Sequence, residues 1–127
     1  MLFITRRRLR RLIDRLSRNY DRKFSYIEDV MKSCITLDQL DHAAIWASAV
    51  MESGRKTEKK KVNDYYFGAI GYFDMMDEVG EYFDLKREII GLLFDRKVNE
   101  LERLEYQAEH QEEAEEEELE NPEEENE

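Results

Sequence analysis

The feature that most constrains this chain is an apolar pattern of helical period between about Thr5 and Met31. Apolar side chains recur there at steps of three and four residues, which is the spacing of one face of an α-helix. At about 100° per residue they form a single stripe. The stripe consists of Leu9, Leu12, Ile13, Leu16, Tyr20, Phe24, Ile27, Val30 and Met31. We expect this helix to bury its stripe, either in a core contact within the chain or in a coiled-coil seam with another chain.

Arginine side chains gather on the opposite face of the same helix. Six of them fall together there: Arg7, Arg8, Arg11, Arg15, Arg18 and Arg22. This set, the arginine ridge, is about 22 Å long at a rise of about 1.5 Å per residue. Because guanidinium groups bind phosphates and carboxylates with planar, two-pronged geometry, we expect the ridge to contact nucleic acid or an acidic partner. Base-sequence recognition is not expected, because no helix-turn-helix, zinc-finger or RNA-binding sheet pattern accompanies it.

Two alternatives for the arginine ridge stay open. Its arginines could pair with carboxylates of this chain or of a neighbouring subunit. The helix could also lie on an anionic membrane surface, where Leu2, Phe3 and Ile4 would suit insertion. No run of the chain approaches the roughly 18 apolar residues of a membrane-spanning helix, so no membrane span is predicted.

The segment from Thr36 to Gln39 marks the start of a second predicted helix. Its pattern is that of a capping box, in which the Thr36 hydroxyl and the Gln39 side chain satisfy amide groups at a helix start. Leu40 and several alanines supply the apolar face of this helix. Ser53-Gly54 predicts its end, because glycine accepts the left-handed conformation found at helix C-caps.

A third helix is expected over residues 58–79 and a fourth after Gly80. Gly68 and Gly71 fall inside the third helix, where each costs about 1 kcal/mol relative to alanine. Their spacing predicts a notch into which another helix backbone or an aromatic ring packs. Gly80 predicts the break between the two helices. No segment alternates with period two for long enough to indicate a strand, so the predicted fold class is all-α.

The predicted architecture is a small antiparallel bundle of about four helices, with a long arginine-rich N-terminal helix and an acidic C-terminal tail. The length of 127 residues fits one domain. We place a single helical domain at residues 1–106, in which residues 1–31 form the basic amphipathic helix and residues 36–106 form the bundle. Residues 107–127 form a glutamate-rich tail.

Charge is distributed unevenly along the chain. Residues 1–23 hold nine basic and two acidic side chains, whereas residues 107–127 hold 12 glutamates and no lysine or arginine. The formal charge of the whole chain is −11. Because like charges repel and little apolar area is available, the tail is predicted to be disordered. It could mimic nucleic acid, shield the arginine ridge or act as a solubilising appendage.

Aromatic side chains cluster in the second half of the chain, and most of them are expected in the core. Three consecutive aromatics, Tyr65 to Phe67, cannot all face inward on one helix, so at least one is expected on the surface. Exposed tyrosines suit protein interfaces, because they are amphipathic and lose little side-chain entropy. The residues predicted to form a protein interface are Tyr65, Tyr66, Phe67 and Tyr72.

Patterns of catalysis and metal binding are missing from the sequence. It has no glycine-rich phosphate loop, no His-Glu-x-x-His and no Gly-x-Ser-x-Gly. His42 is expected to be a structural histidine, and His110 lies among glutamates that would hold a divalent cation only weakly. Cys34 is expected to be a small buried apolar side chain. We therefore predict no enzyme activity, no cofactor and no metal site.

We expect the chain to be a non-enzymatic structural or accessory subunit of a larger assembly, for example of a phage or a nucleoprotein. It would bind protein partners through helical faces, and nucleic acid or acidic surfaces through the arginine ridge. Non-specific nucleic-acid contact and homo-oligomerisation are further partner hypotheses. The alternative is a small acidic inhibitor that mimics nucleic acid and blocks a nucleic-acid-binding protein. Because no apolar run follows the basic residues as in a secretory signal, we expect a cytoplasmic or viral-particle location and no secretion.

Overall fold

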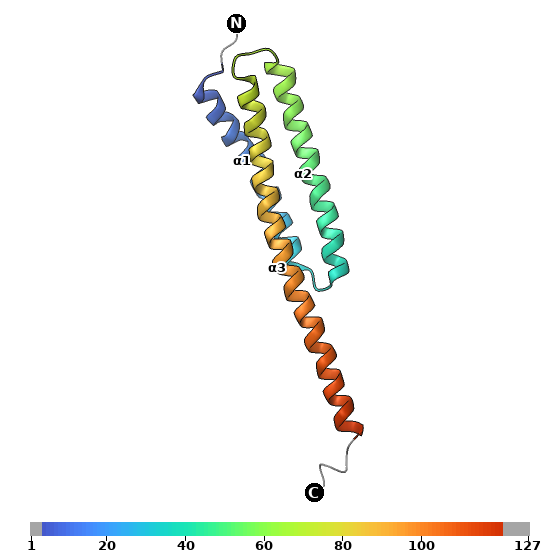
Figure 1. Ribbon diagram of the computed structural model, residues 1–127. Coiled ribbons are helices and arrows are strands. Elements are labelled where there is room, and N and C mark those ends of the chain that lie inside the picture. The colour runs from blue at the N-terminus through green and yellow to red at the C-terminus, as the bar shows by residue number, and fades with distance from the viewer. Residues whose placement is uncertain (1–3, 121–127) are drawn as a thin grey trace.

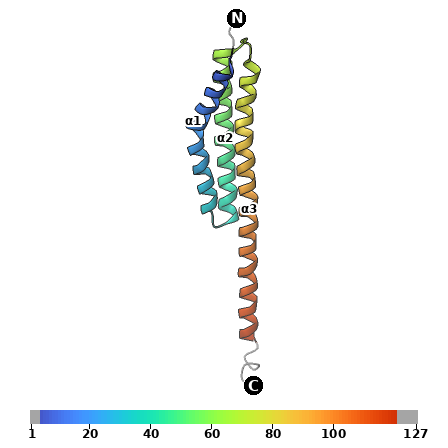
Figure 2. The ribbon, with the colours of Figure 1, turned by 90° about the vertical axis from the view of Figure 1, so that its left-hand side faces the viewer.

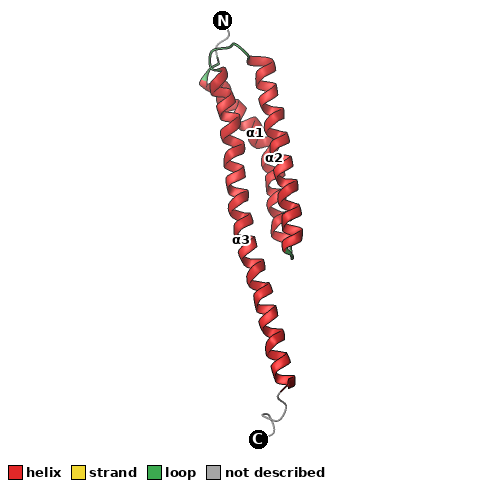
Figure 3. Ribbon diagram, turned by 45° about the vertical axis from the view of Figure 1, so that its right-hand side comes forward, coloured by secondary structure: helices red, strands yellow, loops and turns green. Residues whose placement is uncertain are grey.

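Residues 4–120, which a computed structural model describes, form three α-helices and no strand. The helices are α1 (Arg6–Ser33), α2 (Leu37–Tyr66) and α3 (Tyr72–Glu120). α2 runs antiparallel to α1 and α3, and the three helices pack as a bundle (Figures 1 and 2). Helix accounts for nearly all of the described chain, as the red ribbon of Figure 3 shows. The predicted all-α class is confirmed, but the described residues form three helices instead of about four.

The first helix forms where its apolar period predicts it. Thr5 caps the N-terminus, because its hydroxyl oxygen accepts a hydrogen bond from the Arg8 amide at 3.3 Å. The buried residues of α1 are Leu12, Leu16, Phe24, Ile27 and Met31. The apolar stripe therefore makes a core contact within the chain.

α2 begins at the predicted cap but uses its side chains differently from a capping box. The Thr36 hydroxyl oxygen accepts a hydrogen bond from the Gln39 amide at 3.1 Å, as predicted. The Gln39 side chain reaches one residue further back, where its Oε1 accepts from the Ile35 amide at 3.0 Å. Two amide groups at the helix start are thus satisfied, and the predicted start of α2 is confirmed.

The predicted helix end at Ser53-Gly54 is wrong. α2 continues through Gly54, which is buried midway along it. A Cβ atom on Gly54 would lie 3.0 Å from ring carbons of Tyr20 on α1 and of Phe83 on α3. Glycine is suited to this position because two aromatic rings press against the backbone of α2. This close packing offsets the roughly 1 kcal/mol that a glycine costs in a helix interior.

The turn between α2 and α3 lies inside the predicted third helix, so that prediction is also wrong. Gly68 and Gly71 have φ angles of 81° and 93°, in a region that residues with a Cβ rarely adopt. They turn the chain instead of forming a notch in a helix. Ile4 packs on this turn, and its amide donates a hydrogen bond to the Ile70 carbonyl oxygen at 2.9 Å. The segment before α1 is thereby joined to the α2–α3 turn.

α3 is continuous through the predicted break at Gly80. Val79 and Phe83 on either side of this glycine are buried in the bundle, and Gly80 is itself buried. Packing on both sides of Gly80 keeps the helix intact. The end of the predicted third helix and the whole predicted fourth helix therefore belong to one element. Leu101 is the last buried residue of the described chain.

Residues 102–120 continue α3 past the end of the bundle, and we call them the α3 extension (Figures 1 and 2). The side chains described in this segment are exposed. The predicted disorder therefore does not hold for residues 107–120, while residues 121–127 of the predicted tail lie outside the described residues. The physical reason is that the bundle has already nucleated the helix. Each further residue then adds a backbone hydrogen bond, and glutamate, glutamine and alanine are good helix formers.

Candidate functional site

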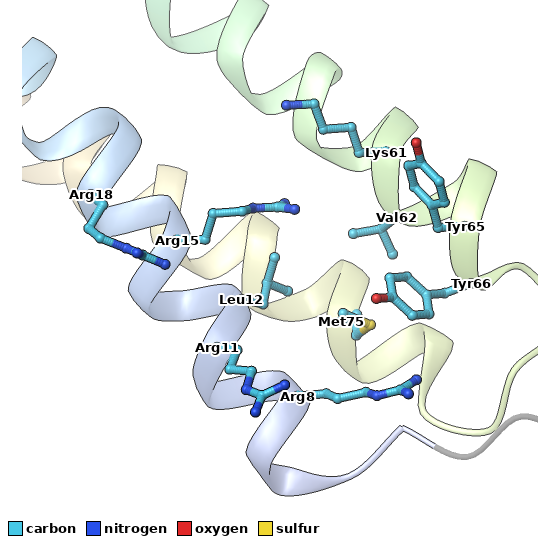
Figure 4. A pocket seen from close by; sticks show the side chains of 10 residues that line it. All are labelled: Arg8, Arg11, Leu12, Arg15, Arg18, Lys61, Val62, Tyr65, Tyr66 and Met75. Atoms are coloured by element: carbon cyan, nitrogen blue, oxygen red, sulfur yellow. The ribbon is translucent and has the colours of Figure 1, made fainter.

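An open groove of about 750 Å³ lies between α1 and α2, at the end of the bundle near the α2–α3 turn (Figure 4). Both helices pack chiefly against α3, so the space between them is lined by side chains and is not filled. We call this space the basic groove. It is lined by Arg8, Arg11, Leu12, Arg15, Arg18, Lys61, Val62, Tyr65, Tyr66 and Met75.

The floor of the basic groove is apolar and buried. Leu12 of α1, Val62 of α2 and Met75 of α3 are all buried, and each helix contributes one of them (Figure 4). Because these three side chains belong to the close-packed core, the base of the groove is part of the core, and the polar side chains surround it.

Five cationic side chains form most of the rim of the basic groove. Arg8, Arg11, Arg15 and Arg18 recur at steps of three and four along one edge of α1, and Lys61 stands on α2. Within residues 4–120, Arg8, Arg11 and Arg18 form no ion pair. Their charges therefore remain available to an anion in the groove.

A buried carboxylate, Glu58, anchors one of these cations. The Glu58 side chain is only 1% exposed, and its Oε2 lies 2.7 Å from the Arg15 Nη2. Its Oε1 accepts a hydrogen bond from the Tyr20 hydroxyl at 2.8 Å and lies 3.4 Å from the Lys61 Nζ. Because a buried charge is tolerated only when it is paired and hydrogen-bonded, these three donors are what allow Glu58 to occupy the core.

The Tyr20 hydroxyl is held in its protonated form. Burial, together with the hydrogen bond and the negative charge of Glu58, raises the pKa of Tyr20 to about 12. Tyr20 therefore remains a hydrogen-bond donor to Glu58 well above neutral pH.

Sequence analysis missed Glu58, although a signal for it was present. Ala47, Met51, Gly54, Glu58 and Val62 recur at steps of three and four, and all five are buried on one face of α2. Because the helix was predicted to end at Gly54, this period was divided between two predicted helices, and Glu58 was not recognised as one of its positions. A continuous period would have marked a carboxylate among apolar positions, which calls for a cationic partner.

The structure divides the arginine ridge into two groups. Arg8, Arg11, Arg15 and Arg18 line the basic groove, whereas Arg7 and Arg22 lie on exposed surface outside it. Arg15 pairs with a carboxylate of its own chain, which is one of the alternatives left open for the ridge.

The aromatic residues predicted to form a protein interface are also divided. Tyr65, with 78% of its surface exposed, and the partly buried Tyr66 line the basic groove opposite the arginines. Phe67 and Tyr72 lie at the α2–α3 turn, with ring centroids 5.6 Å apart. The Tyr72 hydroxyl donates a hydrogen bond to Asn63 Oδ1 at 2.7 Å. Tyrosines and arginines that the sequence places far apart thus meet at one site.

The remaining candidate residues lie apart from the groove. Cys34 is buried, as predicted. His42 is exposed, and its Nδ1 lies 2.9 Å from the Asp38 carbonyl oxygen. Within residues 4–120, no three histidine, cysteine or acidic side chains come together as metal ligands. None of the described helices combines the length and the apolar character needed to cross a membrane.

The fold and the groove define a class of protein: a three-helix bundle with a basic groove near the α2–α3 turn and an acidic helical extension that projects from the opposite end of the bundle. No family model, curated protein or solved structure matches this chain. The case for a function therefore rests on the geometry and charge of the groove.

Proposed function

We propose that this chain is a non-enzymatic accessory subunit of a larger assembly and binds nucleic acid in the basic groove. The observation that carries the proposal is the convergence of five cations and two tyrosines on one open groove. Phosphates attract the arginines and Lys61, and bases offer faces on which tyrosine rings stack. Contacts of this kind position the nucleic acid without reading its sequence.

A single strand suits the groove better than a duplex. Arg8 to Arg18 spans about 15 Å along α1, which matches a short stretch of phosphates. The exposed ring of Tyr65 stands opposite these arginines, but only an unpaired base can stack on it. We therefore propose that single-stranded nucleic acid is preferred.

A membrane surface fits the arginine ridge less well. Insertion of a basic amphipathic helix requires its apolar face to enter the lipid. In this structure Leu16 and Ile27, in the middle of that face, are fully buried in the bundle. The arginines of α1 thus stand beside a groove and not beside an apolar surface that could enter lipid.

The test is fluorescence anisotropy of labelled single strands and duplexes over a salt series. The groove variant carries Arg8→Ala, Arg11→Ala and Arg18→Ala, and the matched control carries Arg7→Ala, Arg10→Ala and Arg22→Ala. Both lose the same charge from the same helix, but only the first alters the groove. Since each phosphate contact contributes about 0.7 to the salt slope for single strands, we expect the groove variant to lose about two from that slope. Equal loss in both variants, or no binding by the unaltered chain at low salt, contradicts the proposal.

The tyrosine contact is tested separately with Tyr65→Ala. We expect a loss of about 1–3 kcal/mol in the affinity for single strands and little change for duplexes, because the stacking partner is an unpaired base. Phe73→Ala is the control, since Phe73 is as exposed as Tyr65 but lies outside the groove. Equal losses in the two variants would mean that the groove does not direct stacking.

The second candidate function, an acidic mimic of nucleic acid, is favoured by the α3 extension. It presents many glutamates on a projecting helix, where they are accessible to a basic partner. An inhibitor of this kind loses its effect on a nucleic-acid-binding protein when these glutamates are changed to glutamine, and keeps it in the groove variant. A nucleic-acid-binding subunit shows the opposite dependence.

A further inference from the structure

We infer that the α3 extension of one copy of this chain docks in the basic groove of a second copy, so that the protein associates head to tail. The inference goes beyond nucleic-acid binding and does not depend on it, although both occupants would use the same groove. Three observations support it: the direction of the extension, its charge and its apolar residues.

The α3 extension cannot reach the groove of its own chain. Met75 of α3 lies in the floor of the groove, and α3 runs from there as one helix away from it (Figures 1 and 4). Glu109 is 34 residues further along, which corresponds to about 51 Å of helix. Shielding of the arginine ridge by residues 102–120 of the same chain is therefore excluded by this geometry, whereas a second copy can bring its extension to the groove.

The charges of the two surfaces are complementary. The α3 extension holds ten glutamates and one arginine. The residues that line the basic groove include five cations and no carboxylate, and Glu58 pairs with two of these cations, Arg15 and Lys61. A glutamate-rich helix in the groove would neutralise Arg8, Arg11 and Arg18, which have no ion pair within residues 4–120.

Both surfaces also carry apolar residues. Leu104, Ala108 and Leu119 recur on one face of the α3 extension, where they are exposed, and glutamates flank them. The groove offers an apolar floor between the arginines of α1 on one side and Lys61, Tyr65 and Tyr66 of α2 on the other. A helix laid between α1 and α2 would take the place of the fourth helix of a four-helix bundle.

The two surfaces are different, so the contact can form in two ways. In a twofold pair, each copy places its extension in the groove of the other, and the assembly closes as a dimer. Where the contact instead repeats from copy to copy, it builds open chains or larger rings. Because charge dominates the contact, added salt weakens it.

Sedimentation velocity of the full-length protein over a range of concentration and salt tests the inference. At low salt we expect a dimer or larger species, and at high salt a monomer. The groove-reversed variant carries Arg8→Glu, Arg11→Glu and Arg18→Glu, and its matched control carries Arg7→Glu, Arg10→Glu and Arg22→Glu. The extension-neutral variant, in which three of the ten glutamates lose their charge, carries Glu109→Gln, Glu112→Gln and Glu116→Gln, and its matched control carries Asp74→Asn, Glu81→Gln and Asp95→Asn. Circular dichroism verifies that all four variants remain helical.

We expect the groove-reversed and the extension-neutral variants each to be monomeric, and both controls to associate like the unaltered protein. The decisive measurement mixes the two monomeric variants. One of them still has a working extension and the other a working groove, so together they form a complex of two chains that cannot grow further. A symmetric contact between identical surfaces would not be restored in this way.

Three results would overturn the inference: a monomeric unaltered protein at low salt, association that survives in the groove-reversed variant, or a mixture that stays monomeric. These results are distinct from failure of the proposed function, which is read from oligonucleotide anisotropy. A protein that binds single strands but does not associate refutes only the head-to-tail contact. A protein that associates but binds no oligonucleotide refutes only the nucleic-acid proposal.

Discussion

The bundle and the α3 extension are both helical, but different forces hold them. In the bundle, Phe83 is buried beside Tyr20 of α1 and Gly54 of α2, and packing decides the conformation. In the extension, no described side chain is buried, and the helix persists because it continues one that the bundle has nucleated. Core packing therefore sets the stability of the protein, while the extension can vary in charge without loss of the fold.

The largest expected difference between the two regions comes from shortening one aromatic side chain in each. Phe83→Ala in the bundle is expected to lower the free energy of unfolding by about 3–5 kcal/mol, because it leaves a cavity beside Tyr20 and Phe24. Tyr106→Ala in the extension is expected to change it by less than about 0.5 kcal/mol, since Tyr106 is 60% exposed. Urea unfolding of both variants measures the difference, and similar losses would show that the extension takes part in the cooperative unit.

A second pair of variants separates packing from helix propensity within the bundle. Gly54→Ala places a Cβ 3.0 Å from two aromatic rings, so we expect the free energy of unfolding to fall by about 1–3 kcal/mol, although alanine is a better helix former than glycine. Gly91→Ala meets nothing within 4 Å and is expected to add about 0.5–1 kcal/mol. Thermal unfolding measures both, and stabilisation by Gly54→Ala would mean that the rings do not press on α2.

The next smaller effect concerns pH. The pKa of Tyr20 in the folded protein is raised to about 12, above the value near 10 of an unfolded tyrosine. The protonated Tyr20 hydroxyl therefore contributes fully to the free energy of unfolding below about pH 10, and this contribution is lost as the pH rises towards about 12. Tyr20→Phe removes the hydrogen bond to Glu58, so we expect the free energy of unfolding to fall by about 1–2 kcal/mol at neutral pH. Between pH 10 and 12, the free energy of unfolding of this variant should decline less steeply than that of the unaltered protein.

Urea unfolding at a series of pH values checks this expectation. Tyr26→Phe is the control, because Tyr26 is exposed and packs edge-on against Trp46. If the Tyr20 variant declined as steeply as the unaltered protein, the alkaline loss would have another origin.

The smallest expected effect is on the extension alone. Neighbouring glutamates repel each other, so salt should raise the helix content of residues 102–120 by screening them. Circular dichroism at low protein concentration should show a small gain with salt in the unaltered chain. The extension-neutral variant should show a smaller gain of helix content with salt. An equal gain in both proteins would mean that the salt acts on the bundle and not on the extension.

The three glycine positions explain why the sequence predicts the fold class but not the number of helices. Glycine breaks a helix when its backbone turns left-handed, as at Gly68 and Gly71, and permits close packing when its missing Cβ admits a ring, as at Gly54. A single sequence does not distinguish these two uses. The helix end was predicted at Gly54 and the close packing at Gly68 and Gly71, and the structure shows the reverse. The apolar period of α1 is less ambiguous, because it is long and has no glycine in it.

The residues of the candidate site could be predicted singly, but their convergence could not. The arginines that line the basic groove were predicted to contact nucleic acid or an acidic partner, and the tyrosines were predicted at a protein interface. Their convergence depends on α2 being one antiparallel helix, which brings Tyr65 and Lys61 beside Arg8 and Arg15. Contacts between residues more than 40 positions apart, such as the pair of Arg15 and Glu58, have no local signal.

The buried carboxylate of Glu58 also restricts how the helices can slide past one another. If α2 moved along α1 by one turn, about 5.4 Å, Glu58 would lose the Tyr20 hydroxyl, because Leu16 and Phe24 stand one turn away from Tyr20 on α1. Arg11 and Arg18 stand one turn away from Arg15, and Lys61 moves with Glu58 on α2, so cations would still face the carboxylate. Loss of a hydrogen-bond donor from a buried acceptor costs about 1–3 kcal/mol, a considerable share of the stability of a small domain. The hydrogen bond between Tyr20 and Glu58 thus favours one alignment of the two helices over its neighbours.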